Sequence, residues 1–318
     1  MHFAGRLQNN QLSTSNHAFD YAGDYEMSRR WRVILAEHFA YSRDPLHVAS
    51  AEGGYDPVLT PGSTRWRSFS DVGVETDLSR SLTLQTGVSG RVDRFQDPAL
   101  ADSETWAGRA GLLKRTGRDQ TVSMTYNYAR FLLTGEDTGG ERVRLPDVSS
   151  HGLEAGWAHA AAGRAEIRLS GGVSQVIREG ERQSLFTGST TYLQPFRHLD
   201  LTVGYRRNLS ADTGVAAVSV SQNAYAGLSA KVGRITTLGL TADYGTRKST
   251  LTADPSTVME GTRVDLIYSG AVLRGTVVVH DRVSVTADAS RRRQHDAMRA
   301  EGDVTVNTCF LGVIFRIF

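Results

Sequence analysis

The sequence predicts an all-β chain that forms a closed antiparallel barrel of about sixteen strands. Three observations lead to this prediction. Apolar and polar residues alternate with a period of two along most of the chain. Tight turns that contain an arginine alternate with longer polar connections. Prolines lie in those connections or beside a turn, because a proline inside a strand would remove a hydrogen bond of the ladder.

The segments "AFDYAGDYEM" (18–27) and "LTLQTGVSGRV" (82–92) illustrate the alternation. One row of each segment is apolar or aromatic, and the other carries glycine, serine, threonine or charge. The strands so defined have roughly 10–15 residues, the length that a tilted strand needs to cross a bilayer. Because lipid offers no hydrogen-bond partners to the backbone, a sheet of such strands must close on itself.

The arginine turns divide the chain into hairpins, with a strand on each side of every turn. A short first strand at 2–8 and a closing strand at 303–318 complete the expected single domain, residues 1–318. The turns contain Arg30, Arg80, Arg118, Arg164, Arg197, Arg234 and Arg282. The longer connections are expected at 43–64, 96–102, 133–147, 179–182, 211–217, 249–261 and 293–302.

Composition excludes several classes of protein. The net charge of +2 gives no electrostatic reason to expect nucleic-acid binding. The single cysteine, Cys309, allows neither an intrachain disulfide nor a thiolate metal cluster. No run approaches the roughly 20 apolar residues of a membrane helix. The start "MHFAGRLQNN" shows no signal peptide, so we expect either a mature form or a cytoplasmic protein.

The last ten residues, "CFLGVIFRIF", carry a resemblance to a known family. The chain resembles the outer-membrane β-barrel proteins of Gram-negative bacteria, including porins, whose last strand is read by the barrel assembly machinery. Here Gly312, Phe315, Ile317 and Phe318 look like that signal, and Arg316 departs from it. The resemblance implies the bacterial outer membrane, short turns in the periplasm, longer loops outside, and contact with outer-membrane lipid and lipopolysaccharide.

Charges of both signs are expected on the lumen face. They could select solutes by charge and size, or they could only pair with one another in an unspecialised lumen. The longest connection, 43–64, could fold inward and place Asp44, Glu52 and Asp56 at a constriction, or it could be a surface loop. The candidate lumen residues are Arg67, Asp71, Glu75, Arg91, Asp93, Arg109, Glu166, Arg168, Arg206, Asp243, Arg247, Arg263, Asp265, Asp288 and Arg292.

In two strands, the sequence does not show clearly which row of side chains faces lipid. Glu37 shares a row with Trp31 and Phe39, which requires either a bulge or an inward-facing aromatic row. In the last strand, both the row of Leu311 and the row of Phe310 are apolar, and a lipid-facing Leu311 row is expected to require a bulge near Cys309–Leu311.

These features predict a porin-like channel for passive passage of a solute or polymer, with no enzymatic step, metal or cofactor. A weaker similarity to barrels of exopolysaccharide export clusters suggests a polysaccharide export system and a periplasmic export partner. The alternatives are a sleeve barrel whose lumen holds a partner such as a cytochrome, and a soluble all-β binding protein. The run 291–299 is expected in an outward loop, where its arginines could meet lipopolysaccharide phosphates.

Adjacent serine, histidine and aspartate residues do not make a catalytic site. Neighbouring residues of a strand point to opposite faces, so such pairs cannot act together as nucleophile and base. The pairs are Ser150–His151, His280–Asp281 and His295–Asp296.

Overall fold

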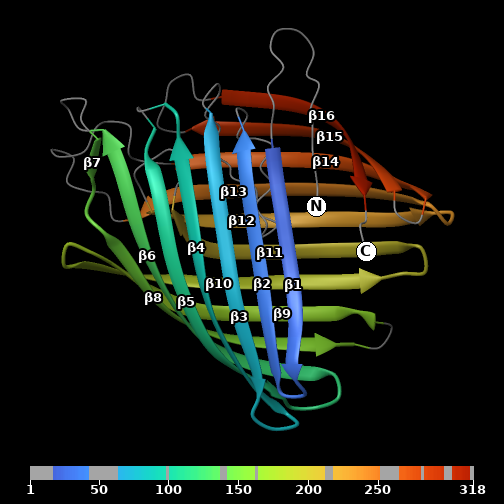
Figure 1. The fold of residues 1–318 in the computed structure, drawn as a ribbon, viewed down its shortest axis with the longest axis horizontal. Helices are drawn as coiled ribbons and strands as arrows, with labels where there is room; N and C mark the ends of the chain where they lie inside the picture. Colours follow the sequence, from blue (N-terminus) through green and yellow to red (C-terminus); the bar gives the residue numbers. More distant parts are fainter. Residues whose placement is uncertain are drawn as a thin grey trace.

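The computed structural model describes residues 17–42, 64–97, 100–136, 142–161, 164–211, 218–250, 265–280, 283–296 and 303–315. They form one antiparallel sheet (Figure 1). No helix in these ranges is long and apolar enough to span a membrane. The strands are β1 (His17–Ser28), β2 (Trp31–Ser42), β3 (Arg65–Asp77), β4 (Leu82–Phe95), β5 (Asp102–Arg115), β6 (Gln120–Glu136), β7 (Arg142–Arg144), β8 (Val148–Ala160), β9 (Glu166–Arg178), β10 (Glu181–Pro195), β11 (Leu199–Ala211), β12 (Val218–Val232), β13 (Thr236–Thr250), β14 (Asp265–His280), β15 (Val283–Asp296) and β16 (Asp303–Phe315).

The sheet is a meander in which each long strand pairs with the next one along the chain. The short strand β7 lies off this path and pairs only with β6. The described residues form 16 strands, the expected number, but one of them, β7, falls inside the predicted connection 133–147. The predicted first strand at 2–8 lies outside the described residues.

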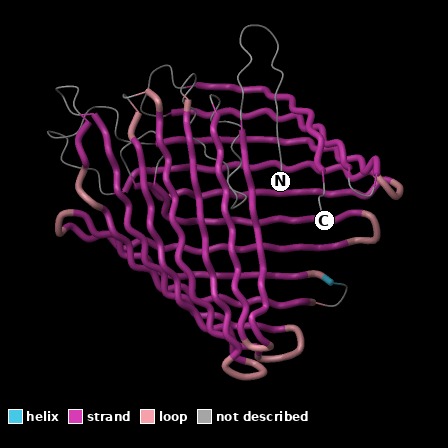
Figure 2. Tube along the Cα trace, in the orientation of Figure 1, coloured by secondary structure: helices cyan, strands magenta, loops and turns pink. Residues whose placement is uncertain are grey.

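The sheet curls strongly, so that β1–β5 pass in front of β9–β15 and cross them at a large angle (Figures 1 and 2). Such curling follows from the right-handed twist of long strands. Within the described ranges, β1 and β16 are the two outer members of the sheet and do not pair with each other. Closure of the barrel therefore stays a prediction.

One of the predicted long connections is wrong. β9 and β10 are joined by a two-residue turn, with φ of 47° at Glu179 and 89° at Gly180. Positive φ at both positions is the type I′ geometry that matches strand twist, and glycine allows it at the second position. The long connections therefore do not alternate strictly with short turns. β15 also continues to Asp296, so residues 293–296, the first part of the expected 293–302 connection, are strand.

The pairing register sorts the side chains into two faces. Leu201 aligns with Leu228, Leu228 with Leu240, and Leu240 with Leu273, so one row crosses four strands on one face. We call it the apolar face. Large hydrophobic side chains are exposed along its whole width, and they include Tyr21, Tyr25, Leu35, Phe39, Val72, Val88, Trp106, Met124, Leu153, Val173, Phe186, Val203, Leu228, Leu240, Leu273 and Leu311. A patch of this extent suits lipid and not water.

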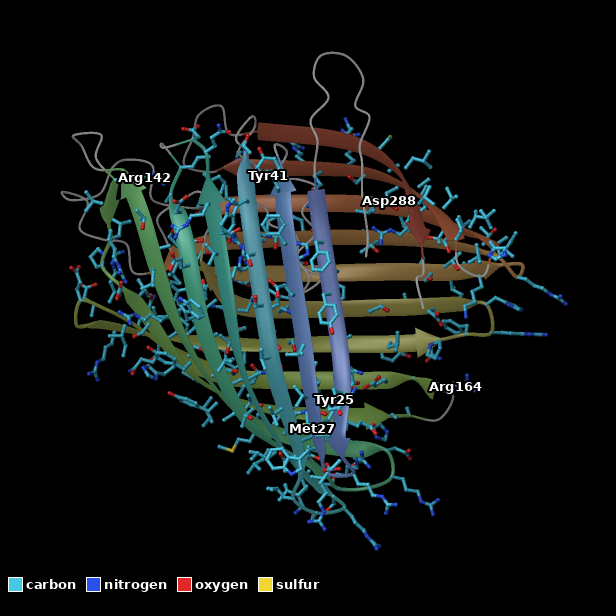
Figure 3. All side chains as sticks on the ribbon, in the orientation of Figure 1. Tyr25, Met27, Tyr41, Arg142, Arg164 and Asp288 are labelled. Carbon is cyan, nitrogen blue, oxygen red and sulfur yellow. The ribbon has the colours of Figure 1, made fainter. Side chains whose placement is uncertain are left out.

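Aromatic side chains mark both edges of the apolar face. Trp31 begins β2 beside a turn, while Tyr41 and Trp66 are aligned at the opposite end of β2 and β3, and all three are exposed. Figure 3 labels Tyr25, Met27 and Tyr41 on the first two strands. The ten residue-to-residue steps from Trp31 to Tyr41 span about 25 Å of membrane depth at the usual strand tilt. This height matches the apolar band of an outer-membrane barrel.

The last strand has a continuous register with β15 from Asp303 to Phe315. Cys309, Leu311 and Val313 are exposed on the apolar face. The row of Leu311 is therefore the lipid-suited one, and the bulge expected for that choice near Cys309–Leu311 is absent. Arg316, Ile317 and Phe318 lie outside the described residues, and the proposed assembly signal stays a prediction.

Glu37 lies exposed on the apolar face, between Leu35 and Phe39. The register is unbroken on both sides of it, and the β1–β2 irregularity lies at Glu26–Ser28. Neither explanation offered by the sequence holds, because no bulge occurs there and the aromatic row shares the apolar face.

We expect Glu37→Leu to stabilise the protein in lipid by about 1–2 kcal/mol, because a carboxylate at this depth is costly to remove from water. Urea unfolding from phosphatidylcholine vesicles measures the effect. Glu154→Leu, on the opposite face, is the control and should give no stabilisation. An unchanged or lower unfolding midpoint for Glu37→Leu would show that this position does not face lipid.

Candidate functional site

The candidate site is the face of the sheet opposite to the apolar face, which we call the polar face. Successive side chains of a strand alternate between the faces, so the register assigns each predicted residue. Figure 3 shows these side chains, with Asp288 labelled on β15. The predicted residues on the polar face are Arg67, Asp71, Glu75, Arg91, Asp93, Arg109, Glu166, Arg168, Arg206, Asp243, Arg247, Asp288 and Arg292.

Two of the predicted lumen residues are not among them. Arg263 lies outside the described residues. Asp265 lies on the apolar face at the start of β14, where its Oδ2 is 3.6 Å from Nζ of Lys248. The sequence misleads here because both rows of β14 carry apolar residues. Leu266 and Tyr268 are buried on the polar face, whereas Ile267 is exposed on the apolar one.

An ion pair ties β3 to β5 across the polar face. Arg109 donates from Nη1 to Asp71 Oδ2 (3.0 Å) and from Nη2 to Asp71 Oδ1 (2.8 Å). The guanidinium crosses β4 above Gly87, where an added Cβ would stand 2.9 Å from Arg109 Nε. Glycine at this position is therefore a condition for the pair to form.

A second cluster surrounds Asp93 near the end of the sheet that carries the long connections. Arg65 and Arg67 donate from Nε to Asp93 Oδ1 (3.0 and 2.7 Å), and Arg91 donates to Oδ2 (2.7 Å). Asp93, Arg65 and Arg67 are almost fully buried, and Arg65 also lies over the ring of Phe95. Sequence reasoning missed Arg65, although it shares a row with Arg67 and Asp71.

The pairs nearer the turns are more open to solvent. Arg32 binds Asp24 (2.9 Å) and lies 3.5 Å from Glu75, and Arg168 binds Glu166 (2.6 Å). Further along the sheet, Arg274 donates from Nε to Asp288 Oδ1 (2.8 Å) and from Nη2 to Asp288 Oδ2 (2.9 Å). Many of the predicted lumen charges therefore pair with charges of opposite sign.

The polar face of β12–β15 carries a mixed polar group. Asp243 and Arg292 are aligned on either side of Gly270, and Asp243 is buried. Oδ1 of Asp243 accepts no hydrogen bond from the described part of the chain. Tyr268 lies above Gly245, where a Cβ would stand 2.5 Å from its hydroxyl. Carboxylate, guanidinium and phenol groups together are able to bind a polyhydroxylated solute.

Apolar side chains pack together toward the end with the long connections. Phe131, Val148, Val176 and Val218 form this buried cluster, and Leu185 packs against it. At this end of the sheet, the polar face is therefore covered by apolar side chains from β6, β8, β9 and β10. Asp44, Glu52 and Asp56 of the expected constriction loop lie outside the described residues.

Ion pairs hold residues 142–147, between β6 and β8, in place. Asp147 accepts hydrogen bonds from Arg130 Nε and Arg144 Nη2, both at 3.2 Å. The bond from Arg130, followed by that from Arg144, lowers the pKa of Asp147 below its ordinary value of 3.8. Arg142 of β7 also donates to Asp102 (2.7 Å). These contacts fix residues 142–147 beside β5 and β6.

The adjacent residues Ser150 and His151 point to opposite faces of the sheet, as the alternation predicts. Ser150 is buried on the polar face, whereas His151 lies on the apolar face, where Nδ1 is 2.7 Å from the hydroxyl of Tyr126. No three metal-ligating side chains gather in the described ranges.

No protein-family model matches the sequence, and no curated protein matches it. Solved structures do match. The chain is similar to the FrpB iron transporter from Neisseria meningitidis in its F5-1 apoprotein form, with a TM-score of 0.52 and 12% identity over 92% of this chain and 55% of that one. For the F3-3 variant the TM-score is 0.51, with 11% identity over 92% and 54%.

This likeness shows the fold. The described strands form an antiparallel sheet with the fold of these two iron transporter structures, and the chain spans little more than half of their length. The exposed apolar face agrees with the bacterial outer membrane, the location expected from the sequence.

We expect Asp93→Asn to destabilise the folded protein by about 3–5 kcal/mol, because three arginines lose the buried carboxylate that they share. Urea unfolding in lipid vesicles measures the loss. Glu166→Gln breaks a more exposed pair and should cost less than about 1 kcal/mol. Equal effects of the two substitutions would contradict the special role of the Asp93 cluster.

Acid should loosen residues 142–147. Because folding lowers the pKa of Asp147, its stabilising contribution is complete above pH 3.8 and is lost as the pH falls through the lowered pKa. Amide hydrogen exchange in 142–147 should accelerate over that range, after correction for intrinsic rates. Asp147→Asn should remove the acid-dependent step, and a step of equal size in this variant would assign it to another group.

Proposed function

We propose that the chain is a transport barrel of the bacterial outer membrane that passes hydrophilic solutes along its polar face, without a chemical step or a cofactor. One observation carries the proposal. The same strands expose a lipid-suited apolar face with aromatic edges and, on the other face, hold charges paired across two or three strands. A water-filled passage lined in this way admits solutes by size and charge.

The solute class is also part of the proposal. Charges of both signs, together with serine, threonine and tyrosine, favour neutral or zwitterionic hydrophilic solutes over strongly charged ones. Thr191 and Tyr225 lie within hydrogen-bond distance, 3.1 Å, and Asp243 offers an acceptor nearby in the same face. These groups suit the hydroxyls of a saccharide, which supports passage of a polysaccharide or its fragments.

Conductance across a planar bilayer tests the passage. The folded protein, identified in the outer-membrane fraction by heat-modifiable mobility, should give stable channels in potassium chloride. A folded protein that conducts no ions and purifies with a protein in its lumen would instead support the sleeve barrel. A protein that stays in the soluble fraction with native β-structure would support the soluble binding protein.

Ion selectivity then tests whether the polar face lines the passage. Asp71→Asn leaves Arg109 without its carboxylate, so the reversal potential in a salt gradient should shift toward anion preference. Asp71→Asn combined with Arg109→Gln should restore most of the original selectivity. Asp265→Asn, on the apolar face, is the matched control and should cause no shift. A shift in the control alone would contradict the assignment of faces.

A further inference from the structure

One carboxylate of the polar face stands apart from the ion pairs. Glu154 lies at the centre of β8 (Val148–Ala160) and is half-buried. The register aligns it with Thr125 on β6 and with Gly172 on β9. Glu154 makes no hydrogen bond or ion pair with the described residues. Its charge is therefore not compensated by a neighbour in the part of the sheet that the structure describes.

The guanidinium groups on the strands around Glu154 are, by contrast, already engaged. On β5, Arg109 binds Asp71, and on β9, Arg168 binds Glu166. The other arginines predicted for this face also interact with other groups, namely Arg206, Arg247 and Arg292. Glu154 thus offers a solute a negative charge at mid-depth that none of these arginines neutralises.

The surroundings of Glu154 on its own strand are low. Its neighbours on the polar face of β8 are Gly152 and Gly156, which carry no side chain. The hydroxyl of Ser174 lies above Gly152, where an added Cβ would stand 2.8 Å from Oγ, and the hydroxyl of Ser123 lies above Gly156. The carboxylate therefore stands beside glycines and hydroxyl groups, with no long side chain next to it on β8.

This arrangement suits a solute that carries both an ammonium group and hydroxyl groups. A carboxylate accepts charge-assisted hydrogen bonds from an ammonium group, and these are roughly twice as strong as bonds between neutral groups. The serine and threonine hydroxyls nearby are able to donate to the hydroxyl groups of the same solute and to accept from them. An amino sugar combines the two kinds of group.

We propose that Glu154 binds the protonated amino group of an amino sugar on the polar face. The inference rests on the proposed function, because it requires that solutes reach this face. It narrows the solute class from saccharides in general to saccharides with a free amino group. Glu154 is then a residue that determines specificity, whereas the paired charges around it fix the sheet.

Binding of glucosamine and N-acetylglucosamine to the folded protein in a non-ionic detergent tests the proposal. The two sugars share one ring and differ in the charge on the nitrogen. Dissociation constants are measured by saturation-transfer NMR at a pH at which the amino group of glucosamine is protonated. The wild-type protein should bind glucosamine at least about fivefold more tightly than N-acetylglucosamine. Equal affinities, or no binding of glucosamine, would overturn the proposal.

Two matched substitutions assign the site. Glu154→Gln keeps the size of the side chain and removes its charge, so the affinity for glucosamine should fall about fivefold, while that for N-acetylglucosamine changes by less than about twofold. Asp265→Asn removes the same charge from the apolar face and should retain the preference. A preference that persists in Glu154→Gln, or that disappears in Asp265→Asn, would overturn the assignment.

The wild-type protein provides a second measurement that does not depend on the folding of a variant. Heat-modifiable mobility shows whether Glu154→Gln is folded. If it is not, the salt dependence of the wild-type protein decides, because salt screens the attraction between a half-buried carboxylate and an ammonium group. The preference for glucosamine should shrink as sodium chloride is raised. A preference that is independent of salt would contradict a bond to Glu154.

Sugar binding needs no conductance, so this inference and the proposed passage fail in separate measurements. A protein that conducts ions but binds both sugars equally retains the passage and loses the Glu154 site. A protein that prefers glucosamine through Glu154 but does not conduct retains the site and loses the passage.

Discussion

Backbone hydrogen bonding in lipid is the constraint on which the rest of the structure depends. Strands of 12 to 17 residues pair with their chain neighbours along nearly their whole length, as β12 and β13 do from Val218 to Val232. An unpaired amide or carbonyl group in hydrocarbon costs several kcal/mol, so a membrane sheet leaves none along its strands. Long strands, a meander order and short turns follow from this requirement, because each minimises the unpaired backbone within the bilayer.

The same constraint determines where polar side chains are placed. Once pairing fixes the register, every strand offers one row to lipid and one to the other face. The exposed leucines of β12–β14 occupy the first row, and ion pairs such as Asp71–Arg109 and Arg274–Asp288 occupy the second. Glu37 is the clear exception near the middle of the first row. Arg291 and Arg293 stand on the same row nearer the end of the apolar band, where long cationic side chains can extend toward the headgroups.

Much of the fold was predictable from the sequence, since alternation and turn chemistry are local signals. The strands beside the arginine turns, the end of β11 and the end of β4 before 96–102 lie where the pattern indicates. The turn at Glu179–Gly180 was misjudged because a polar glutamate-glycine pair suits both a long loop and a type I′ turn. Asp265 of β14 was assigned to the wrong face, because alternation separates the two rows of a strand but does not show which row faces lipid. When both rows carry apolar residues, as in β14, only the burial seen in the structure decides.

The candidate site was less predictable, because its contacts join residues that no local pattern connects. Alternation placed Asp71 and Arg109 on one face, but their pairing depends on strand order, register and the empty space above Gly87. The cluster around Asp93 likewise needs β3 and β4 in one register. Residue types therefore indicated a polar lining, whereas the partners of each charge required the structure.

These side-chain contacts across the polar face also fix the register of the strands between them. Asp71 reaches Arg109 across β4, and Tyr225 reaches Thr191 across β11 above Gly204. A slip of one residue in either intervening strand would put a side chain into the space that the glycine leaves, and it would also separate the paired groups. The residues that we propose to line the passage therefore also fix the register of the sheet. A substitution of one partner of a pair, made to change selectivity, consequently also lowers the stability of the barrel. A substitution of both partners preserves more of that stability.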